Sequence, residues 1–217
     1  MVKENNFEQS RRDMVETQLK RRGIDSPKVL EAFLNVPREN FIPEKSRKYA
    51  YNDSPLSVGY GQTISQPYIV ALMTQLLEIK KNDKVLEIGS GSGYQAAILS
   101  FIGARVFSVE RIKELREIAR NNCENAGFTD VAVVEGDGTL GFKEHAPFDA
   151  IIVTAGAPSV PELLKEQLVD GGRLVIPVGS SFFQDLLRIR KIKNKYKEER
   201  ICGCMFVPLI GKHGWSN

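Results

Sequence analysis

The segment Lys84-Val85-Leu86-Glu87-Ile88-Gly89-Ser90-Gly91-Ser92-Gly93-Tyr94 decides the fold of this chain. A short apolar run carries a carboxylate at Glu87 and then breaks into a loop with glycine at Gly89, Gly91 and Gly93. A helical pattern follows the loop. This order predicts a strand, a tight turn and a helix, with the turn placed to hold a nucleoside-bearing ligand.

The loop also indicates which ligand it holds. Its spacing is Gly-x-Gly-x-Gly, not the Gly-x-Gly-x-x-Gly dinucleotide fingerprint, and it contains no lysine or arginine. Glu87 places a negative charge just before a turn where a pyrophosphate would need N–H groups and a positive field. S-adenosylmethionine has an ammonium, a sulfonium and no phosphate, so it fits this loop better than NAD. Taken alone, the loop is also compatible with a tight turn that binds nothing.

Strands and helices alternate from Lys84 onward, which predicts a parallel sheet with right-handed crossovers. We expect strands near 84–88, 104–109, 131–134, 149–153 and 172–178, and helices near 94–101, 112–126 and 161–168. The tail differs, because no helix fits between the apolar strands 186–192 and 201–207. With a turn at Asn194-Lys195, these two strands are expected to pair antiparallel at the sheet edge.

The N-terminal part of the chain lacks this alternation. A helical pattern covers residues 7–22 and ends at Gly23, and a second helix begins with Ser26-Pro27. Proline then recurs, so residues 35–66 should be largely loop with short helices. We expect one compact domain, with residues 1–80 as a helical and loop cap over the site and residues 81–217 as the Rossmann-like core with its C-terminal hairpin.

Composition excludes several classes of protein. The chain is 42% hydrophobic with a net charge of +3, which fits one globular domain and is too mild to imply nucleic acid. No apolar run is long enough to span a bilayer, and the polar N-terminus lacks a signal-peptide pattern, so we expect a cytoplasmic protein away from membranes. The basic run from Arg188 to Lys197 could touch RNA, but we favour the solvated face of an edge hairpin.

Cysteine and histidine are too scarce for a metal centre. The chain has three cysteines and two histidines, and an odd cysteine count argues against a disulfide framework. Cys202 and Cys204 could form a metal or redox pair if both point to one face of a strand. We favour two small, buried apolar side chains, because no Cys-x-x-Cys motif or histidine partner accompanies them. No metal is expected.

The predicted strand ends bring further candidates to the cofactor. In an open parallel sheet the ligand lies beyond the carboxyl ends of the strands. Glu110 ends the second strand, about 20 residues past the loop, where an acid accepts hydrogen bonds from ribose hydroxyls; Arg111 follows it. Asp137, between Gly136 and Gly138 after the third strand, could accept from an adenine amine. A solvated charge and an ordinary turn are the alternatives.

Two other segments limit the chemistry. Residues 154–158, after the fourth strand, lack the acidic or amide residue, two prolines and aromatic residue typical of enzymes that methylate planar amino nitrogens. This disfavours a nucleic-acid base as substrate. The glycine-rich segment 59–67 precedes a helix, and Ser65 could cap that helix. Its hydroxyl could equally face a substrate carboxylate.

The chain resembles the protein-L-isoaspartate O-methyltransferases through most of its length. The resemblance is carried by residues 36–43, 59–67, 87–94, 136–138, 148–151, 171–177 and 206–209, and Gly61-Gln62-Thr63-Ile64-Ser65 is its most specific part. It implies an S-adenosylmethionine-dependent methyltransferase fold, in which Ser65 is the active-site hydroxyl and Gln62, Thr63, Ile64 and Ser65 border the cofactor. The family's substrates are isoaspartyl proteins and peptides, and we expect a monomer. Tyr60 replaces a frequent histidine, and Val70 replaces a polar cofactor contact of some members.

This chemistry agrees with the residues. A carboxylate acceptor is ionised at pH 7 and needs no general base, in a chain poor in histidine. The enzyme has to align the reacting atoms and exclude water. We expect Ser65 to orient the carboxylate, residues 35–66 to act as a lid, and an edge strand ending at Val207-Pro208-Leu209 to pair with the peptide. The alternatives are another methyltransferase, an NAD-dependent oxidoreductase and a non-catalytic binding module.

Overall fold

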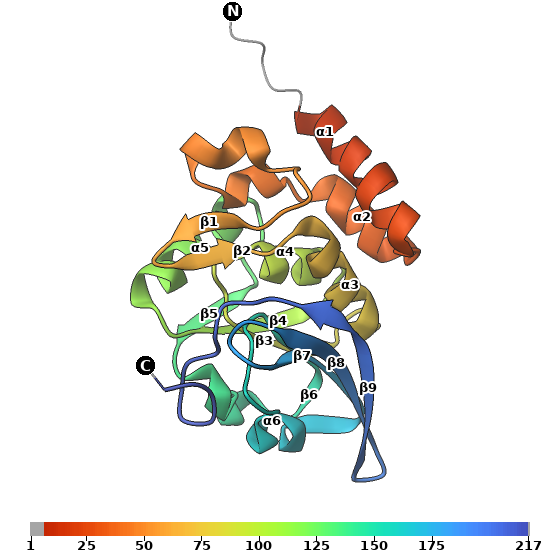
Figure 1. The fold of residues 1–217 in the computed structure, drawn as a ribbon, viewed down its shortest axis with the longest axis vertical. Coiled ribbons are helices and arrows are strands. Elements are labelled where there is room, and N and C mark those ends of the chain that lie inside the picture. The colour runs from red at the N-terminus through yellow and green to blue at the C-terminus, as the bar shows by residue number, and fades with distance from the viewer. Residues whose placement is uncertain (1–6, 217) are drawn as a thin grey trace, which may run out of the picture.

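A seven-stranded sheet forms the centre of the computed structural model, which describes residues 7–216 (Figure 1). Its order is β5-β4-β3-β6-β7-β8-β9. The strands are β3 Lys84–Ile88, β4 Arg105–Glu110, β5 Ala132–Glu135, β6 Phe148–Val153, β7 Leu168–Gly179, β8 Gln184–Ile192 and β9 Lys195–Cys204. The first five strands in this order pair parallel, whereas β8 and β9 are antiparallel. The predicted Rossmann-like fold with an edge hairpin is confirmed.

The helices also lie close to their predicted positions. They are α1 Phe7–Met14, α2 Pro27–Asn35, α3 Pro67–Leu77, α4 Tyr94–Phe101, α5 Lys113–Asn125 and α6 Glu162–Glu166. After α1, a π-helical turn η1 (Val15–Leu19) and a 3₁₀ turn η2 (Lys20–Arg22) continue the helical path until Gly23, which has φ +86°. The short helices η3 (Arg38–Phe41) and η4 (Glu44–Tyr49) lie within the expected loop region, and η5 (Gly138–Leu140) and η6 (Lys143–His145) follow β5.

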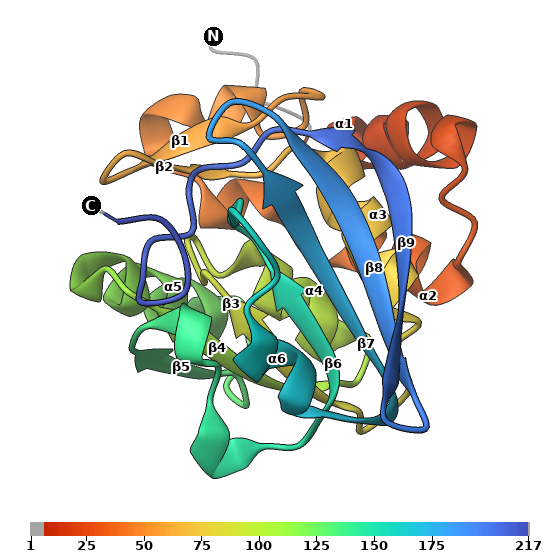
Figure 2. The same cartoon turned by 60° about the horizontal axis from the view of Figure 1, so that its bottom comes forward.

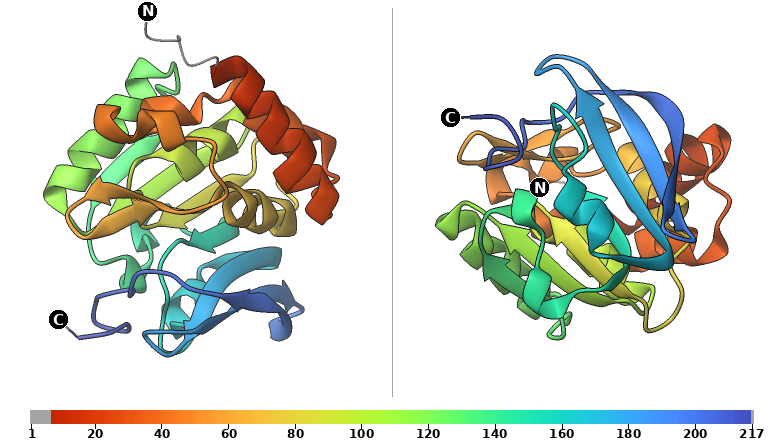
Figure 3. Two further views of the ribbon diagram at one scale, coloured as in Figure 1. Left: turned by 45° about the horizontal axis from the view of Figure 1, so that its top comes forward. Right: turned by 90° about the horizontal axis from the view of Figure 1, so that it is seen from below.

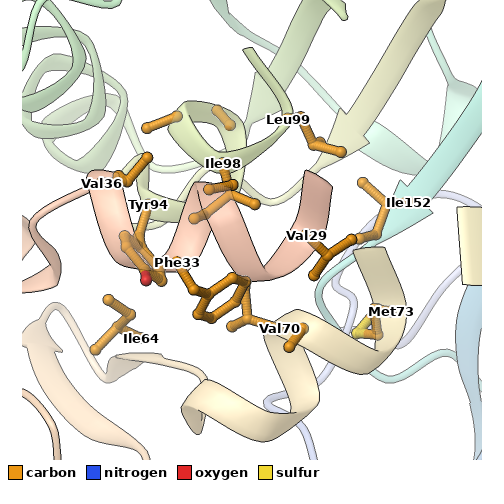
Figure 4. Close-up of a cluster of buried hydrophobic side chains, with 14 of the residues drawn as sticks. Val29, Phe33, Val36, Ile64, Val70, Met73, Tyr94, Ile98, Leu99 and Ile152 are labelled. Carbon is orange, nitrogen blue, oxygen red and sulfur yellow. The ribbon is translucent and has the colours of Figure 1, made fainter. Parts of the chain in front are cut away.

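Strand residues alternate between two hydrophobic cores, as period-two side chains require. Ala150 and Ile152 of β6 belong to one core, and Ile151 and Val153 belong to the other. In the first core, side chains from α2, α3 and α4 meet (Figure 4); Phe33 and Tyr94 make an edge contact there. The N-terminal segments and the sheet therefore share one core, and the lid is anchored to the strands that carry the site.

Two local details differ from the prediction. Residues 35–66, expected to be largely loop with short helices, also contain a small antiparallel hairpin of β1 (Leu56–Gly59) and β2 (Gln62–Ile64). Gly59, Tyr60 and Gly61 all have positive φ, which makes the tight turn that pairs these strands. At the edge, β9 begins at Lys195 and ends at Cys204, and the turn lies at Lys193-Asn194, one residue before the predicted position.

Two residues of the basic run, Arg188 and Arg190, form ion pairs with acids. Arg188 contacts Glu199 at 2.5 Å and Glu78 at 3.3 Å, and Arg190 also contacts Glu78. These pairs agree with the solvated edge face that we favoured over an RNA site. The side chains of Cys202 and Cys204 pack against the first core, as expected for small apolar side chains.

No helix within residues 7–216 has the length and apolar character needed to cross a bilayer. The polar segment 1–6, on which the absence of a signal peptide was argued, lies outside the described residues.

Candidate active site

A cavity opens where the strand order changes direction. The chain runs from β3 outward through β4 to β5 and then returns to β6 on the other side of β3. Ligands of open α/β sheets bind at such a point, beyond the carboxyl ends of the strands. The walls come from the β2–α3 segment, the glycine loop, the ends of β4 and β6, and the chain after β9, which Figure 2 shows at one end of the sheet.

Most of the predicted residues line this cavity. They are Gln62, Thr63, Ile64, Ser65, Glu87, Gly89, Gly91, Glu110, Arg111 and Gly138. Gly93, Gly136 and Asp137 do not reach its surface. Val70 and residues 207–209, singled out from the resemblance, line it as well.

Two glycines of the loop, Gly89 and Gly93, are packed too closely for a side chain. Gly89 has φ +92°, and a Cβ there would lie 2.5 Å from Oγ1 of Thr154. That hydroxyl donates to the carbonyls of Ile88 and Gly89, at 3.0 and 2.6 Å. Gly93 precedes α4, and its Cβ would lie 2.8 Å from the carbonyl oxygen of Ala119. Gly93 therefore lets α4 pack against α5, while Gly89 and Gly91 face the ligand space.

Glu87 is a buried carboxyl group without a cation. It is 0% exposed, and its Oε2 accepts from the hydroxyl of Ser108, which in turn contacts the Ser90 hydroxyl at 2.5 Å. Its Oε1 has no hydrogen-bond partner among the described residues. Burial raises the pKa of Glu87 to about 8; the Ser108 hydrogen bond opposes this and the Glu110 charge adds to it. A cationic ligand in the cavity would favour the ionised form.

The raised pKa of Glu87 predicts a pH dependence of stability without ligand. The folded state holds this proton more tightly than the unfolded state, whose carboxyl titrates near 4.5. The contribution of Glu87 is therefore complete below about 4.5 and is lost as the pH rises toward 8. Chemical denaturation from pH 4.5 to 8 should show that Glu87→Gln gains stability relative to wild type as pH rises. Parallel curves for the two proteins would contradict this.

Glu110 holds the loop from the neighbouring strand. Its Oε2 accepts from the N–H of Gly91 and its Oε1 accepts from the N–H of Ile112, both at 3.0 Å. Each oxygen keeps a lone pair for a further donor, as a ribose diol would require. Glu110 thus fixes the glycine loop and lines the cavity at the same time.

Asp137 makes contacts that the sequence did not predict. Its carboxylate accepts from the N–H and hydroxyl of Thr139, at 2.9 and 2.7 Å, and from the N–H of Lys212 at 2.8 Å. Of the three residues 136–138, only Gly138 lines the cavity. In this structure Asp137 joins the turn after β5 to the C-terminal segment, and it does not face the ligand space.

Ser65 stands at the cavity between β2 and α3. Helix α3 begins at Pro67 with Gln66 as its N-cap and without a capping side chain, so the interpretation of Ser65 as a helix cap is wrong. Within residues 7–216 its hydroxyl makes no hydrogen bond. Its carbonyl accepts from Nη2 of the fully buried Arg38 at 2.7 Å, and Arg38 Nε donates to the carbonyl of Ala50 at 2.8 Å. The backbone is fixed while the hydroxyl stays available.

The opposite wall consists of residues 207–210. Gly156 donates to the carbonyl of Val207 and accepts from the N–H of Leu209, both at 2.8 Å. Trp215 Nε1 donates to the carbonyl of Gly156 at 3.0 Å, and the Trp215 N–H donates to the carbonyl of Leu209 at 2.8 Å. Because β9 ends at Cys204, the expectation of an edge strand that ends at Val207-Pro208-Leu209 is wrong. The N–H of Val207 and the carbonyl of Pro208 take part in none of these bonds, and their pairing with a peptide stays a prediction.

Several lining residues were not predicted as site residues, among them Ile112, Thr154 and Ile210. Thr154 directly follows β6, and its position at a strand end was the available signal. Ile112 lies two residues after Glu110 and is bound to it through the backbone. Ile210 gave no local signal, because the contacts of the C-terminal segment place it.

Comparison with known proteins identifies the family. The family model for protein-L-isoaspartate(D-aspartate) O-methyltransferase matches residues 9–214. The chain belongs to this family. It is 57% identical over 212 residues to protein-L-isoaspartate O-methyltransferase 2 of Pelobacter propionicus, covering 97% of this chain and 94% of that protein. The protein-L-isoaspartate O-methyltransferase of Syntrophus aciditrophicus is 52% identical over 213 residues, 97% of this chain and 98% of its own.

Solved structures of protein-L-isoaspartate O-methyltransferases have the same fold. One of them has a TM-score of 0.85 at 34% identity, over 94% of this chain and 67% of that chain. Another, from Plasmodium falciparum and in complex with S-adenosyl-L-homocysteine, has a TM-score of 0.82 at 30% identity, over 95% and 99%.

The cavity of this family member fits S-adenosylmethionine. Its charged lining residues are Glu87, Glu110 and Arg111, and Arg111 is exposed to solvent. The buried Oε1 of Glu87 lacks a partner, which suits a cationic ligand. Gly138 faces the cavity where a Cβ would overlap the side chain of Ile88. An acidic pocket lined by glycine binds a cationic nucleoside more readily than a pyrophosphate.

Proposed function

We propose that the protein transfers a methyl group from S-adenosylmethionine to the free α-carboxylate of L-isoaspartyl residues in damaged proteins and peptides, which initiates their repair. One observation carries this proposal. The unbonded hydroxyl of Ser65 lines the same cavity as the acidic glycine loop. The names of the relatives and the family agree with this activity.

S-adenosylmethionine, when bound, supplies an electrophilic methyl group on a sulfonium. Glu87 offers its charge to the cationic end, and Glu110 accepts hydrogen bonds from ribose hydroxyls while holding Gly91. The residues that border the cofactor are Gln62, Thr63, Ile64, Ser65, Gly89, Gly91, Arg111 and Gly138. Gly93, Gly136 and Asp137 support them by fixing α4 and the turn after β5.

Ser65 positions the acceptor. An isoaspartyl α-carboxylate is ionised at neutral pH, so no side chain has to remove a proton, and no histidine lines the cavity. The Ser65 hydroxyl donates a hydrogen bond to one carboxylate oxygen and leaves the other free to attack. Arg38 holds the Ser65 backbone, and the packed lid excludes water, which would otherwise solvate the anion.

Glu110→Ala is expected to weaken binding of S-adenosyl-L-homocysteine by roughly 1–3 kcal/mol, the scale of hydrogen bonds to a charged group. The loss combines the ribose bonds with the released Gly91 N–H. Isothermal titration measures it directly, with Glu124→Ala on the exposed face of α5 as the matched control. Unchanged affinity in Glu110→Ala would remove the ribose assignment.

Two peptides of one sequence, differing only in an aspartyl or isoaspartyl linkage, test the function. The linkage shifts the carboxylate by about 1 Å or more, so methylation of the isoaspartyl peptide should be faster by on the order of a hundredfold. Equal methylation of both peptides would defeat the proposal. The proposal would also be defeated if the protein methylated neither peptide but methylated RNA.

We further propose that the protein acts in the cytoplasm as a monomer, without nucleic acid. The ion-paired hairpin leaves little unpaired basic surface on Arg188 and Arg190 for RNA. Sedimentation of the purified protein measures its oligomeric state.

A further inference from the structure

An apolar surface lies at the rim of the cavity, formed by Phe182, Phe183, Met205 and Pro208. Phe182 is 83% exposed, Phe183 57% and Met205 76%. Pro208 is also exposed, and it lines the cavity. The surface is therefore continuous with the site, although none of the other three residues lines the cavity. Large apolar side chains exposed side by side are typical of interaction sites.

The strand register brings these side chains together. The β8–β9 ladder ends at the pair Gln184 and Cys204, so Phe183 and Met205 are the residues that directly adjoin its end. A Cβ on Gly203 would lie 2.7 Å from Cζ of Phe183, so the Phe183 ring lies on the bare backbone of this glycine. The two segments thus present one surface.

The buried side chain of Gln184 joins the β7–β8 turn, which carries Phe182 and Phe183 and is called the aromatic turn below, to the chain after β9. Its Nε2 donates to the carbonyl of Ser180 at 2.5 Å, and its Oε1 accepts from the N–H of Phe206 at 2.8 Å. Figures 1 and 3 show the chain after β9 running between the β1–β2 hairpin and the β7–β8 turn. The surface therefore extends the outer wall of the cavity on the side away from that hairpin.

A polypeptide acceptor has to cross this rim. The isoaspartyl residue enters the cavity, but the chain continues from it in two directions. The cavity is bounded on one side by residues 62–65 and on the other by residues 207–210, so one arm of the peptide leaves over the second wall. The first side chains that it brings there meet Pro208, Met205 and the aromatic turn.

We propose that this surface binds large apolar side chains on one flank of the isoaspartyl residue. The proposal rests on the proposed function and deepens it, because it makes the enzyme favour damage sites with apolar neighbours. Moving one such side chain from water onto Phe182, Phe183 and Met205 should raise kcat/KM by about tenfold, the effect of burying part of a leucine or phenylalanine.

A peptide panel tests this preference. Each peptide carries one isoaspartyl residue, with leucine or serine at a single position within three residues on either side. Wild type is compared with Phe182→Ser/Met205→Ser, and with Phe182→Ser alone in case the double variant unfolds. Ile192→Ser is the matched control, because Ile192 is 48% exposed at the opposite end of β8.

The expected result is a leucine preference on one flank in wild type and in Ile192→Ser. The double variant should lose that preference, keep its rate on the serine peptides and keep its melting temperature. An unchanged preference in the variants overturns the proposal. The proposal is also overturned if the variants change only the self-association seen in sedimentation, because the surface would then bind a second copy of the protein. Failure of wild type on every isoaspartyl peptide overturns the proposed function instead.

Discussion

Replacing Ser65 with alanine is expected to lower kcat by roughly a hundredfold or more, while the affinity for S-adenosyl-L-homocysteine stays unchanged. Without the hydroxyl, the acceptor carboxylate loses the hydrogen bond that aligns it, and a misplacement of about 1 Å costs this much. The cavity wall itself stays in place, because the Ser65 carbonyl is bound by Arg38 and not by the lost hydroxyl. Turnover and isothermal titration measure the two effects separately.

Two variants control this experiment. Ser65→Thr keeps a hydroxyl and should recover part of the rate. Ser57→Ala removes an exposed hydroxyl from the adjoining β1–β2 hairpin, outside the cavity, and should have wild-type turnover. If Ser65→Ala instead lowers the melting temperature and keeps its turnover, Ser65 is a packing residue only.

Gly89→Ala is expected to lower the free energy of unfolding by roughly 2–6 kcal/mol and to abolish binding of S-adenosyl-L-homocysteine. Two costs add up. Alanine is strained at φ +92°, and its Cβ would lie 2.5 Å from Oγ1 of Thr154. Relief requires the loop to move, which takes the Gly91 N–H away from Glu110. Chemical denaturation and isothermal titration measure the two outcomes.

Gly127 provides a control for the backbone term. It has φ +88°, and a Cβ there would meet no atom within 4 Å, so Gly127→Ala carries the strain without the clash. Gly127→Ala should lower the free energy of unfolding by about 1–3 kcal/mol and leave ligand binding unchanged. Equal losses in the two variants would show that contact with Thr154 is unimportant. Adding Thr154→Ala to Gly89→Ala should reveal a coupling of about 1 kcal/mol or more.

The sequence predicted the parallel part of the sheet well, because its central strands are mostly apolar and buried. Strand β3 was placed at its observed bounds, and Glu87, Gly89 and Glu110 reach the cavity as expected. Strand β9 was misplaced because it is an exposed edge strand. Its first half, Lys195–Arg200, is polar on both faces, so no apolar alternation marks where it begins.

The contacts at the site that the sequence analysis missed join residues far apart in the chain. Asp137 was expected to accept from an adenine amine, and the structure adds a bond to its Oδ2 from the N–H of Lys212, 75 residues away. Ser65 could be a helix cap by residue type, but Gln66 is the N-cap of α3 and Arg38 binds the Ser65 carbonyl. No local pattern around residue 137 or residue 65 reports a partner so far away in the chain.

The hydrogen bond from Trp215 Nε1 to the carbonyl of Gly156 has a consequence for synthesis of the chain. The glycine loop leaves the ribosome early, whereas the facing wall, residues 207–210, and Trp215 are translated much later. A nascent chain can fold its first strands and helices while the methyl-donor pocket still lacks one side. We therefore expect the ability to bind S-adenosyl-L-homocysteine to arise abruptly, when the C-terminal segment leaves the ribosome and Trp215 binds Gly156.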